Sequence, residues 1–299
     1  MFRNVAELVT LAEQHQVKIA EIMIRQEIEV TGLTREEIIA KMENNLTVME
    51  QALERGLQGV KSQTGLTGGD AVLLQKYIKS GRALSGHILL DAVSKAVATN
   101  EVNAAMGVIC ATPTAGSAGV VPGTLFAVKE QLNPTRQEMI EFLFTAAAFG
   151  FVVANNATVS GAAGGCQAEV GSAAGMAAAS IVEMAGGTPQ QAAEAMAITL
   201  KNMLGLVCDP VAGLVEVPCV KRNAMGASNA ITAADMALAG ITSRIPCDEV
   251  IGAMYAIGKS MPSSLRETAE GGLAATPTGR RLEAEIFGQP KESLMDYLV

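Results

Sequence analysis

Two runs of 27 residues without a charged side chain, 102–128 and 142–168, constrain this chain more than any other feature of its sequence. Runs of that length raise the question of a membrane span, which needs about 20 consecutive apolar residues. Pro113, Pro122 and four glycines interrupt the first run, and Asn155, Asn156 and closely spaced glycines interrupt the second. Such breaks are unsuited to a lipid-facing helix. We therefore expect a deeply buried protein interior and no membrane partner.

Charge and composition exclude several classes of protein. Residues 102–220 carry only 11 charged side chains, against 24 in 1–101 and 17 in 221–299. The whole chain is 49% hydrophobic, 17% charged and 3% aromatic with a net charge of −8, which excludes a disordered chain and argues against nucleic-acid binding. Residues 1–16 contain no apolar signal segment, so we expect a cytoplasmic protein with reduced thiols.

Helix-start signals recur along the chain. Thr34–Glu37 and Thr135–Glu138 have the capping-box pattern, and Thr188–Gln191 adds a proline at the first helical position. Ser264–Glu267 predicts the start of another short helix, and the small residues of Ala173–Ser180 predict closely packed helices. Sustained alternation of β-branched residues is missing, so the sequence predicts a mostly α fold with a buried Ala/Gly-rich central core.

No linker or repeat divides the chain, which predicts one domain over 1–299. The amphipathic residues 1–101 are expected to form an outer helical layer around a core formed by 102–299.

The cysteines are the main candidates for chemistry. Taken one at a time, a cysteine is most often a small, buried and inert residue. Three of them lie at predicted breaks between helices, and zinc-type paired spacing is absent, with His15 and His87 far away in sequence. Thiolates without nearby histidines suit an iron–sulfur cluster, although cysteine count alone is a weak signal. The five cysteines are Cys110, Cys166, Cys208, Cys219 and Cys247.

Four segments resemble the bacterial iron–sulfur L-serine dehydratases: Pro113–Gly119, Asn156–Gly171, Cys208–Cys219 and Met261–Leu273. The resemblance covers nearly the whole chain and points to the α chain of the two-subunit form, whose β chain is a separate polypeptide. It implies a lyase of serine catabolism and gluconeogenesis that converts L-serine to pyruvate and ammonia. An open iron of a 4Fe–4S cluster would act there as a Lewis acid on the serine hydroxyl and carboxylate.

The resemblance also implies which residues hold the cluster. The three ligands map onto Cys166, Cys208 and Cys219, whereas Cys110 and Cys247 match no ligand position. In single-chain relatives a C-terminal cysteine can be a fourth ligand, and Asp296–Val299 contain none, so an open iron or an exogenous ligand is expected. Residues 102–299 then form the cluster- and substrate-binding core.

The catalytic base remains unassigned by the sequence. Neither His15 nor His87 lies among the motifs, so we expect the base to come from a β chain in a heterodimer or larger oligomer.

Candidate substrate-binding residues are polar side chains in or near the charge-free segments. They could bind serine, or equally cap helix ends inside the core. Lys259 and Arg266 could bind the substrate carboxylate, although a solvated lysine is the more common outcome. The other candidates are Thr114, Ser117, Asn155, Asn156 and Ser160.

Two other functions fit parts of the sequence. A pyridoxal-phosphate-dependent amino-acid dehydratase could use the glycine-rich 115–119 for its phosphate, but the central segment offers only Lys129 and Lys201 for a Schiff base. A helical membrane-associated or scaffold protein would explain the apolar middle third, and it predicts detergent dependence and no bound iron.

Overall fold

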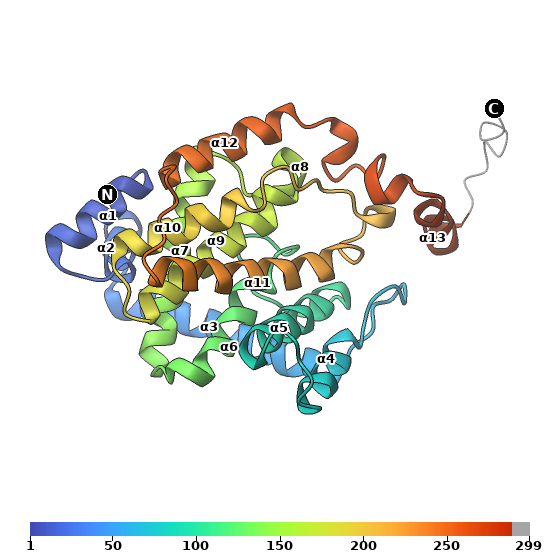
Figure 1. Cartoon of the computed structure of the whole chain (residues 1–299), viewed down its shortest axis with the longest axis horizontal. Coiled ribbons are helices and arrows are strands. Elements are labelled where there is room, and N and C mark those ends of the chain that lie inside the picture. Colours follow the sequence, from blue (N-terminus) through green and yellow to red (C-terminus); the bar gives the residue numbers. More distant parts are fainter. Residues whose placement is uncertain (289–299) are drawn as a thin grey trace.

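Helix α9 (Cys166–Met184) runs through the centre of the computed structural model, which describes residues 1–288 (Figure 1). Every residue from 166 to 182 is buried, because α6, α7, α10 and α11 all pack against this helix. A helix enclosed on all sides needs small or apolar residues all round. All eight residues of Ala173–Ser180, for which close helix packing is predicted, are buried.

The described residues form thirteen α-helices and three short 3-10 turns, with no β-strand among them, so the predicted mostly α fold is confirmed. One isolated bridge pairs Cys208 with Arg266. The last residues of the sequence, including Asp296–Val299, lie outside the described part. The other elements are α1 (Val5–His15), α2 (Ile19–Thr31), α3 (Arg35–Gln58), α4 (Asp70–Lys79), α5 (His87–Ala104), α6 (Val120–Leu132), α7 (Arg136–Asn156), α8 (Gly161–Gly164), α10 (Pro189–Lys201), η1 (Val211–Gly213), α11 (Cys219–Leu238), α12 (Cys247–Ser260), η2 (Ser263–Leu265), η3 (Gly272–Ala275) and α13 (Pro277–Phe287).

The helix-start signals read from the sequence are confirmed at three positions. Thr34, Thr135 and Thr188 each form a complete capping box at the start of α3, α7 and α10. The prediction that a helix starts at Ser264–Glu267 was wrong. Its first residues form only the 3-10 turn η2, and Glu267 has a left-handed φ of 65°. The reason is tertiary, because the Glu267 backbone N–H donates to the Cys208 carbonyl at 2.7 Å.

Helix α5 lies inside the protein, where it packs against α3, α4, α6 and α11. Residues 94–102 of this helix are all buried, and they include the charged side chains of Lys95 and Glu101. Among the helices that precede α6, α1 and α2 lie at one end of the protein and α3 and α4 lie along the side of α5 (Figure 1).

Carboxylates from the core cap three of these outer helices at their N-termini. Asp248 accepts hydrogen bonds from the first two backbone N–H groups of α1 at 2.8 and 3.0 Å. Glu183 does the same for α2, and Glu101 accepts from the first N–H of α4 at 2.7 Å. Helix N-termini carry unpaired N–H groups and a partial positive charge, so a carboxylate there stabilises the contact. Three carboxylates thus attach the N-termini of α1, α2 and α4 to α12, α9 and α5.

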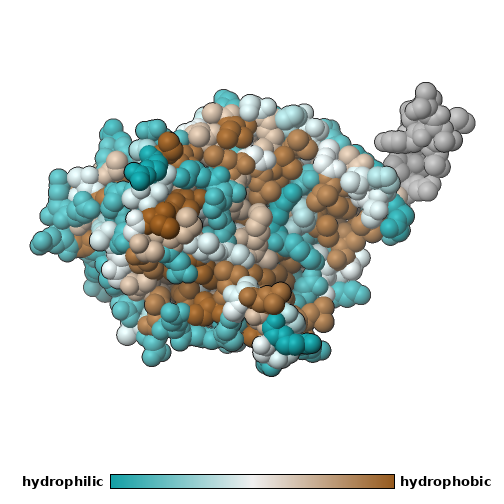
Figure 2. Space-filling view, in the orientation of Figure 1, coloured by the Kyte–Doolittle hydropathy of each residue, from teal (hydrophilic) through white to brown (hydrophobic). Residues whose placement is uncertain are grey.

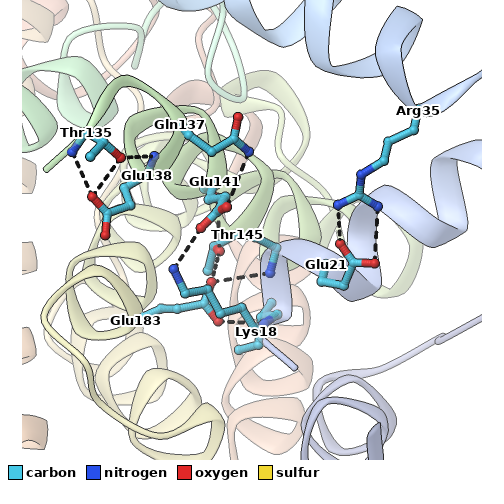
Figure 3. A network of polar contacts seen from close by, with 11 residues as sticks. Lys18, Glu21, Arg35, Thr135, Gln137, Glu138, Glu141, Thr145 and Glu183 are labelled. Carbon is cyan, nitrogen blue, oxygen red and sulfur yellow. Dashed lines mark hydrogen bonds and ion pairs between the residues drawn. The ribbon is translucent and has the colours of Figure 1, made fainter. Parts of the chain in front are cut away.

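The Glu183 contact is part of a larger polar network (Figure 3). The Thr145 hydroxyl of α7 donates to Glu183, and Lys18, the residue before α2, pairs with Glu141 at 2.7 Å. Burial raises the pKa of the Glu183 carboxyl above its usual value, although the hydrogen bonds that it accepts oppose the shift. One carboxylate therefore joins α9, α7 and α2.

Of the described helices, α7 alone has the length and apolar composition to cross a membrane, and 67% of its apolar window is buried against the rest of the protein. The first charge-free run is divided between the end of α5, the loop 105–119 and α6. On the face shown in Figure 2, apolar groups occur as separate patches among hydrophilic ones.

Candidate metal centre

Three buried cysteines lie where helices begin or end, as the sequence predicts. Cys166 is the first residue of α9, Cys219 is the first residue of α11, and Cys208 lies in the segment that follows α10. All three are free thiols, with exposures of only 1%, 2% and 6% for Cys166, Cys208 and Cys219. The site is therefore made by helix N-termini and one irregular segment, which the protein interior surrounds.

The local backbone fixes two of these cysteines. Gly165 precedes Cys166 with a left-handed φ of 76°, and a Cβ there would lie 2.8 Å from the Leu206 carbonyl oxygen, so glycine is required. Cys208 donates its backbone N–H to the Leu265 carbonyl at 2.9 Å and accepts from Glu267. The segment 263–267, which belongs to the last motif, thereby holds the Cys208 loop in place.

Glu169 joins the cysteines, although the sequence analysis did not single it out. The Sγ atoms of Cys166 and Cys208 and one carboxylate oxygen of Glu169 lie within 4.8 Å of one another. Burial raises the pKa of the Glu169 carboxyl, and the negative charge of Glu267 raises it further. Its signal in the sequence is that it is the first charged residue after the run 142–168, one helical turn beyond Cys166.

Cys219 lies farther from this set than its members lie from each other. It is not among the donors that fall within 4.8 Å. Burial raises the pKa of the Cys219 thiol, and the nearby negative charge of Cys166 adds to that effect. The three cysteines of the prediction thus lie in one region, with Cys166 and Cys208 as the closer pair.

Arg222 is a second residue that the sequence analysis missed. It lies one turn after Cys219, and its Nη1 is 3.5 Å from the Cys166 Sγ and 2.9 Å from the Val207 carbonyl. Its Nη2 pairs with Asp209 at 2.8 Å. A hydrogen bond from the Cys208 thiol and the positive charge of Arg222 lower the pKa of Cys166 despite its burial. Cys166 is therefore the thiol most readily present as thiolate.

Two glycines leave room around the Glu169 carboxylate. A Cβ on Gly116 would lie 2.5 Å from Oε1 of Glu169. A Cβ on Gly161 would lie 3.1 Å from the Cys208 Sγ, 3.1 Å from Oε2 of Glu169 and 3.3 Å from Oε2 of Glu267. The motifs 113–119 and 156–171 therefore meet at this carboxylate, and their glycines are needed for that close approach.

Asn223 ties the first motif to the helix that begins with Cys219. Its fully buried amide accepts from the Gly119 N–H at 3.0 Å and donates to the carbonyls of Gly116 and Cys219 at 2.8 and 2.9 Å. A buried amide with these three bonds holds the loop 113–119 against α11.

The structure brings two of the candidate substrate-binding residues to the centre. The Thr114 hydroxyl donates to Glu169 and lies 3.1 Å from the buried Ser117 hydroxyl. Asn155 and Asn156 are exposed, and their amides donate to carbonyls of their own helix at 2.8 and 3.0 Å. Ser160 precedes α8, next to Gly161.

Lys259 and Arg266 have different surroundings. Lys259 is exposed at the end of α12, with its ammonium 5.4 Å from the centre of the Tyr255 ring. The backbone of Arg266 pairs with Cys208, and its buried Nε has no hydrogen-bond partner among residues 1–288. Of the two cations, Arg266 is thus the one linked to the cysteine centre.

The remaining candidates lie elsewhere. Cys247 begins α12, and half-buried Cys110 lines a separate apolar cavity of about 360 Å³. Lys201 donates to the Ser243 carbonyl, and the Lys129 ammonium, near the end of α6, lies 6.0 Å from the centre of the Phe126 ring. His15 ends α1, and His87 begins α5.

The fold and this centre define a helical protein built around a buried thiol and carboxylate site. A profile of the Serine dehydratase alpha chain family matches residues 14–274. The chain therefore belongs to the serine dehydratase alpha chain family, and the resemblance read from its motifs is confirmed.

Individual relatives agree with the family match. The chain is 78% identical over 288 residues to the probable L-serine dehydratase alpha chain of Bacillus subtilis, covering 96% of each chain. It is 43% identical to the L-serine dehydratase alpha chain of Peptoniphilus asaccharolyticus, covering 96% of this chain and 99% of that relative. An L-serine dehydratase of Escherichia coli is 36% identical over 91% of this chain, which covers 61% of that longer relative.

Proposed function

We propose that this chain is the catalytic subunit of an L-serine dehydratase, a lyase that converts L-serine to pyruvate and ammonia. The observation that carries the proposal is that buried Cys166 and Cys208 lie together, with buried Cys219 near enough to be influenced by the charge of Cys166, in a chain from this family. Residues 102–299 would form the cluster- and substrate-binding core. The outer layer expected over 1–101 would be limited to α1–α4, because α5, which begins at His87, is itself buried.

The donor set fits an iron–sulfur cluster. Thiolates are the ligands that such clusters require, and these three come from two helix N-termini and one loop. Arg222 offsets part of their negative charge, while Gly116 and Gly161 keep side chains out of the region beside Glu169. When bound, a 4Fe–4S cluster held by Cys166, Cys208 and Cys219 would supply an open iron that acts as a Lewis acid on the serine hydroxyl and carboxylate.

The residues of the chain would bind and orient the substrate around that centre. Thr114 and Ser117 offer hydroxyl groups beside Glu169, and their mutual contact at 3.1 Å keeps them ordered. Arg222 forms an ion pair with Asp209, and Asp209 accepts a hydrogen bond from the Leu273 N–H at 2.7 Å. These contacts attach the motif Met261–Leu273 to the segment that contains Cys208. Burial of this shell would keep water from the reacting atoms. Removal of the α-proton by the catalytic base and loss of the β-hydroxyl as water would then give aminoacrylate, which tautomerises and is hydrolysed to pyruvate and ammonia.

A separate β chain would complete the enzyme. Relatives of matching length are named alpha chains, and the chain covers only 61% of the longer Escherichia coli relative. Neither His15 nor His87 belongs to the centre, so we propose that the β chain brings the catalytic base. Activity that appears only when a β chain is added supports this arrangement, and rapid turnover by the isolated chain contradicts it.

The cluster is tested by anaerobic reconstitution with iron and sulfide, followed by metal analysis and absorbance spectra with and without L-serine. About four irons per chain are expected, with a spectrum that changes when serine binds to iron. Cys166→Ser, Cys208→Ser and Cys219→Ser should each lose iron.

The chain supplies two matched controls, because Cys110→Ser and Cys247→Ser remove thiols outside the centre, and Cys247 is just as buried as the proposed ligands. Both controls should keep iron. Full iron content in the first three variants, or an aldimine-type spectrum in the wild type, contradicts the proposal.

A further inference from the structure

Two thiols and one carboxylate of this site are arranged to contact a single ion. The Sγ atoms of Cys166 and Cys208 and an oxygen of Glu169 lie within 4.8 Å of one another. Two thiolates about 2.3 Å from a tetrahedral zinc ion are about 3.8 Å apart. Small side-chain movements would therefore bring all three donors onto one ion. In a cluster, by contrast, each cysteine binds a different iron atom and the ligands lie farther apart.

We propose that the chain, when it carries no cluster, binds one divalent transition-metal ion of the Zn²⁺ type through Cys166, Glu169 and Cys208, and that this ion and the cluster exclude each other. The binding of the single ion is independent of the proposed function. The mutual exclusion rests on it, because both groups would need Cys166 and Cys208. The bound thiols release their protons to solvent.

The backbone holds the three donors before any ion binds. Cys166 and Glu169 are three residues apart in the first turn of α9, so their side chains share one face of the helix. Cys208 is fixed by two backbone hydrogen bonds to the segment 265–267. Preorganised donors lose little conformational freedom on binding, which favours affinity.

The carboxylate of Glu169 is oriented as a metal ligand would be. The Thr114 hydroxyl donates to Oε1, and Gly116 lies against the same oxygen. A Cβ added to Gly161 would lie 3.1 Å from both Oε2 and the Cys208 Sγ, so this oxygen and the thiol border the same space beside Gly161. Partners that anchor the second atom of a ligand raise metal affinity by about 10- to 100-fold.

The charges around the site favour a dication as the ion that binds. Once the two thiols are deprotonated on binding, they, Glu169 and neighbouring Glu267 would carry four negative charges, against one nearby positive charge on Arg222. Soft thiolate donors select zinc-type ions over magnesium or calcium. Three protein ligands also leave a fourth position of a tetrahedral ion for water.

Cobalt(II) titration of the cluster-free chain tests the single-ion site, because Co²⁺ in a thiolate site has characteristic absorbance bands. We expect one equivalent to bind with a thiolate-to-cobalt band. Cys166→Ser and Cys208→Ser should each lose most of that band, and Glu169→Gln should bind at least tenfold more weakly. Cys219→Ser should bind Co²⁺ like the wild type, which separates this site from the cluster. No thiolate band in the wild type, or a band lost equally in Cys219→Ser, overturns the proposal.

A second pair of variants guards against effects of misfolding. Thr114→Val removes the bond to Glu169 and should weaken Co²⁺ binding by about tenfold. Thr199→Val removes a buried hydroxyl that donates to its own helix, and it should leave Co²⁺ binding unchanged. Equal binding by Thr114→Val and Thr199→Val would contradict the role assigned to the carboxylate.

The exclusion is measured by adding one equivalent of Zn²⁺ before reconstitution with iron and sulfide. Iron uptake should fall in the wild type and recover in Glu169→Gln, which holds Zn²⁺ more weakly. Unchanged iron uptake in the presence of Zn²⁺ overturns the exclusion. If Co²⁺ binds as expected but no cluster forms under any condition, the proposed function fails and the single-ion site stands.

Discussion

Replacing Gly161 by alanine places one methyl group at the meeting point of Cys208, Glu169 and Glu267. The added Cβ would lie 3.1 Å from the first two side chains and 3.3 Å from the third, where ordinary contacts are 3.4–4 Å. These neighbours must therefore move by a few tenths of an ångström. The backbone of Gly161 is outside the left-handed region and accepts alanine, which is worth about 0.5–1 kcal/mol in a helix. We expect the free energy of unfolding to change by less than about 1 kcal/mol.

The metal centre should respond much more strongly than the fold. Displaced ligands and ligand partners lower metal affinity by about 10- to 100-fold, so Gly161→Ala should bind Co²⁺ at least tenfold more weakly. Gly252→Ala in α12 is the matched control, because a Cβ there meets no atom within 4 Å. It should bind metal like the wild type and be slightly more stable. Urea unfolding and Co²⁺ titration of both variants test the reasoning, and equal metal binding by the two refutes it.

Three further predictions concern the scaffold. Glu183→Gln should lower the free energy of unfolding by about 1 kcal/mol near neutral pH, because an NH₂ group replaces one of the two oxygens that accept from Ile19, Ala20 and Thr145. Burial raises the pKa of the Glu183 carboxyl above its pKa in the unfolded chain. The stabilising effect of Glu183 is therefore complete below the unfolded-state pKa, and it declines as the pH rises through the folded-state pKa. Urea unfolding should thus show a larger deficit for Glu183→Gln below about pH 4 than at neutrality, and the opposite trend would contradict the assigned cause. Asn223→Ala leaves the buried Gly119 N–H unpaired, so it should lower the free energy of unfolding by about 2–3 kcal/mol and also lower iron uptake. A variant as stable as the wild type would contradict the hydrogen bonds described. Gly56→Ala places a Cβ 2.2 Å from the Ala98 carbonyl oxygen, so α3 and α5 must move apart. We expect this to lower the free energy of unfolding by about 3 kcal/mol. An unchanged midpoint of thermal unfolding would show that the two helices pack more loosely than described.

The sequence alone predicted the helices whose start signals are local. A capping box joins residues three apart, so Thr34, Thr135 and Thr188 identify their helices without any knowledge of the rest of the fold. The same is true of the cysteines at helix breaks, because glycine and proline beside them end regular structure in any context. The prediction of a helix starting at Ser264–Glu267 failed because the Glu267 backbone N–H donates to the carbonyl of Cys208, which is distant in sequence.

Candidate site residues were harder to rank. Thr114 and Asn155 look alike in sequence, since each is a polar residue in a charge-free run. In the structure Thr114 contacts Glu169, whereas the Asn155 amide is bound to a carbonyl of its own helix. Which of these happens depends on the direction of the side chain and on what packs opposite it. The local sequence pattern specifies neither the direction of the side chain nor the groups that pack opposite it.

Residue types and their spacing thus determined a mostly helical chain, a weakly charged interior and the three cysteines, because short-range hydrogen bonding and the exclusion of charge from the core act locally. Only the tertiary structure decided that Glu169 and Arg222 join Cys166, and that Asp248 caps a helix more than 240 residues away in sequence. Those contacts form when helices distant in sequence pack together. A buried charge without a partner is unfavourable, and tertiary packing determines which group lies close enough to pair with it.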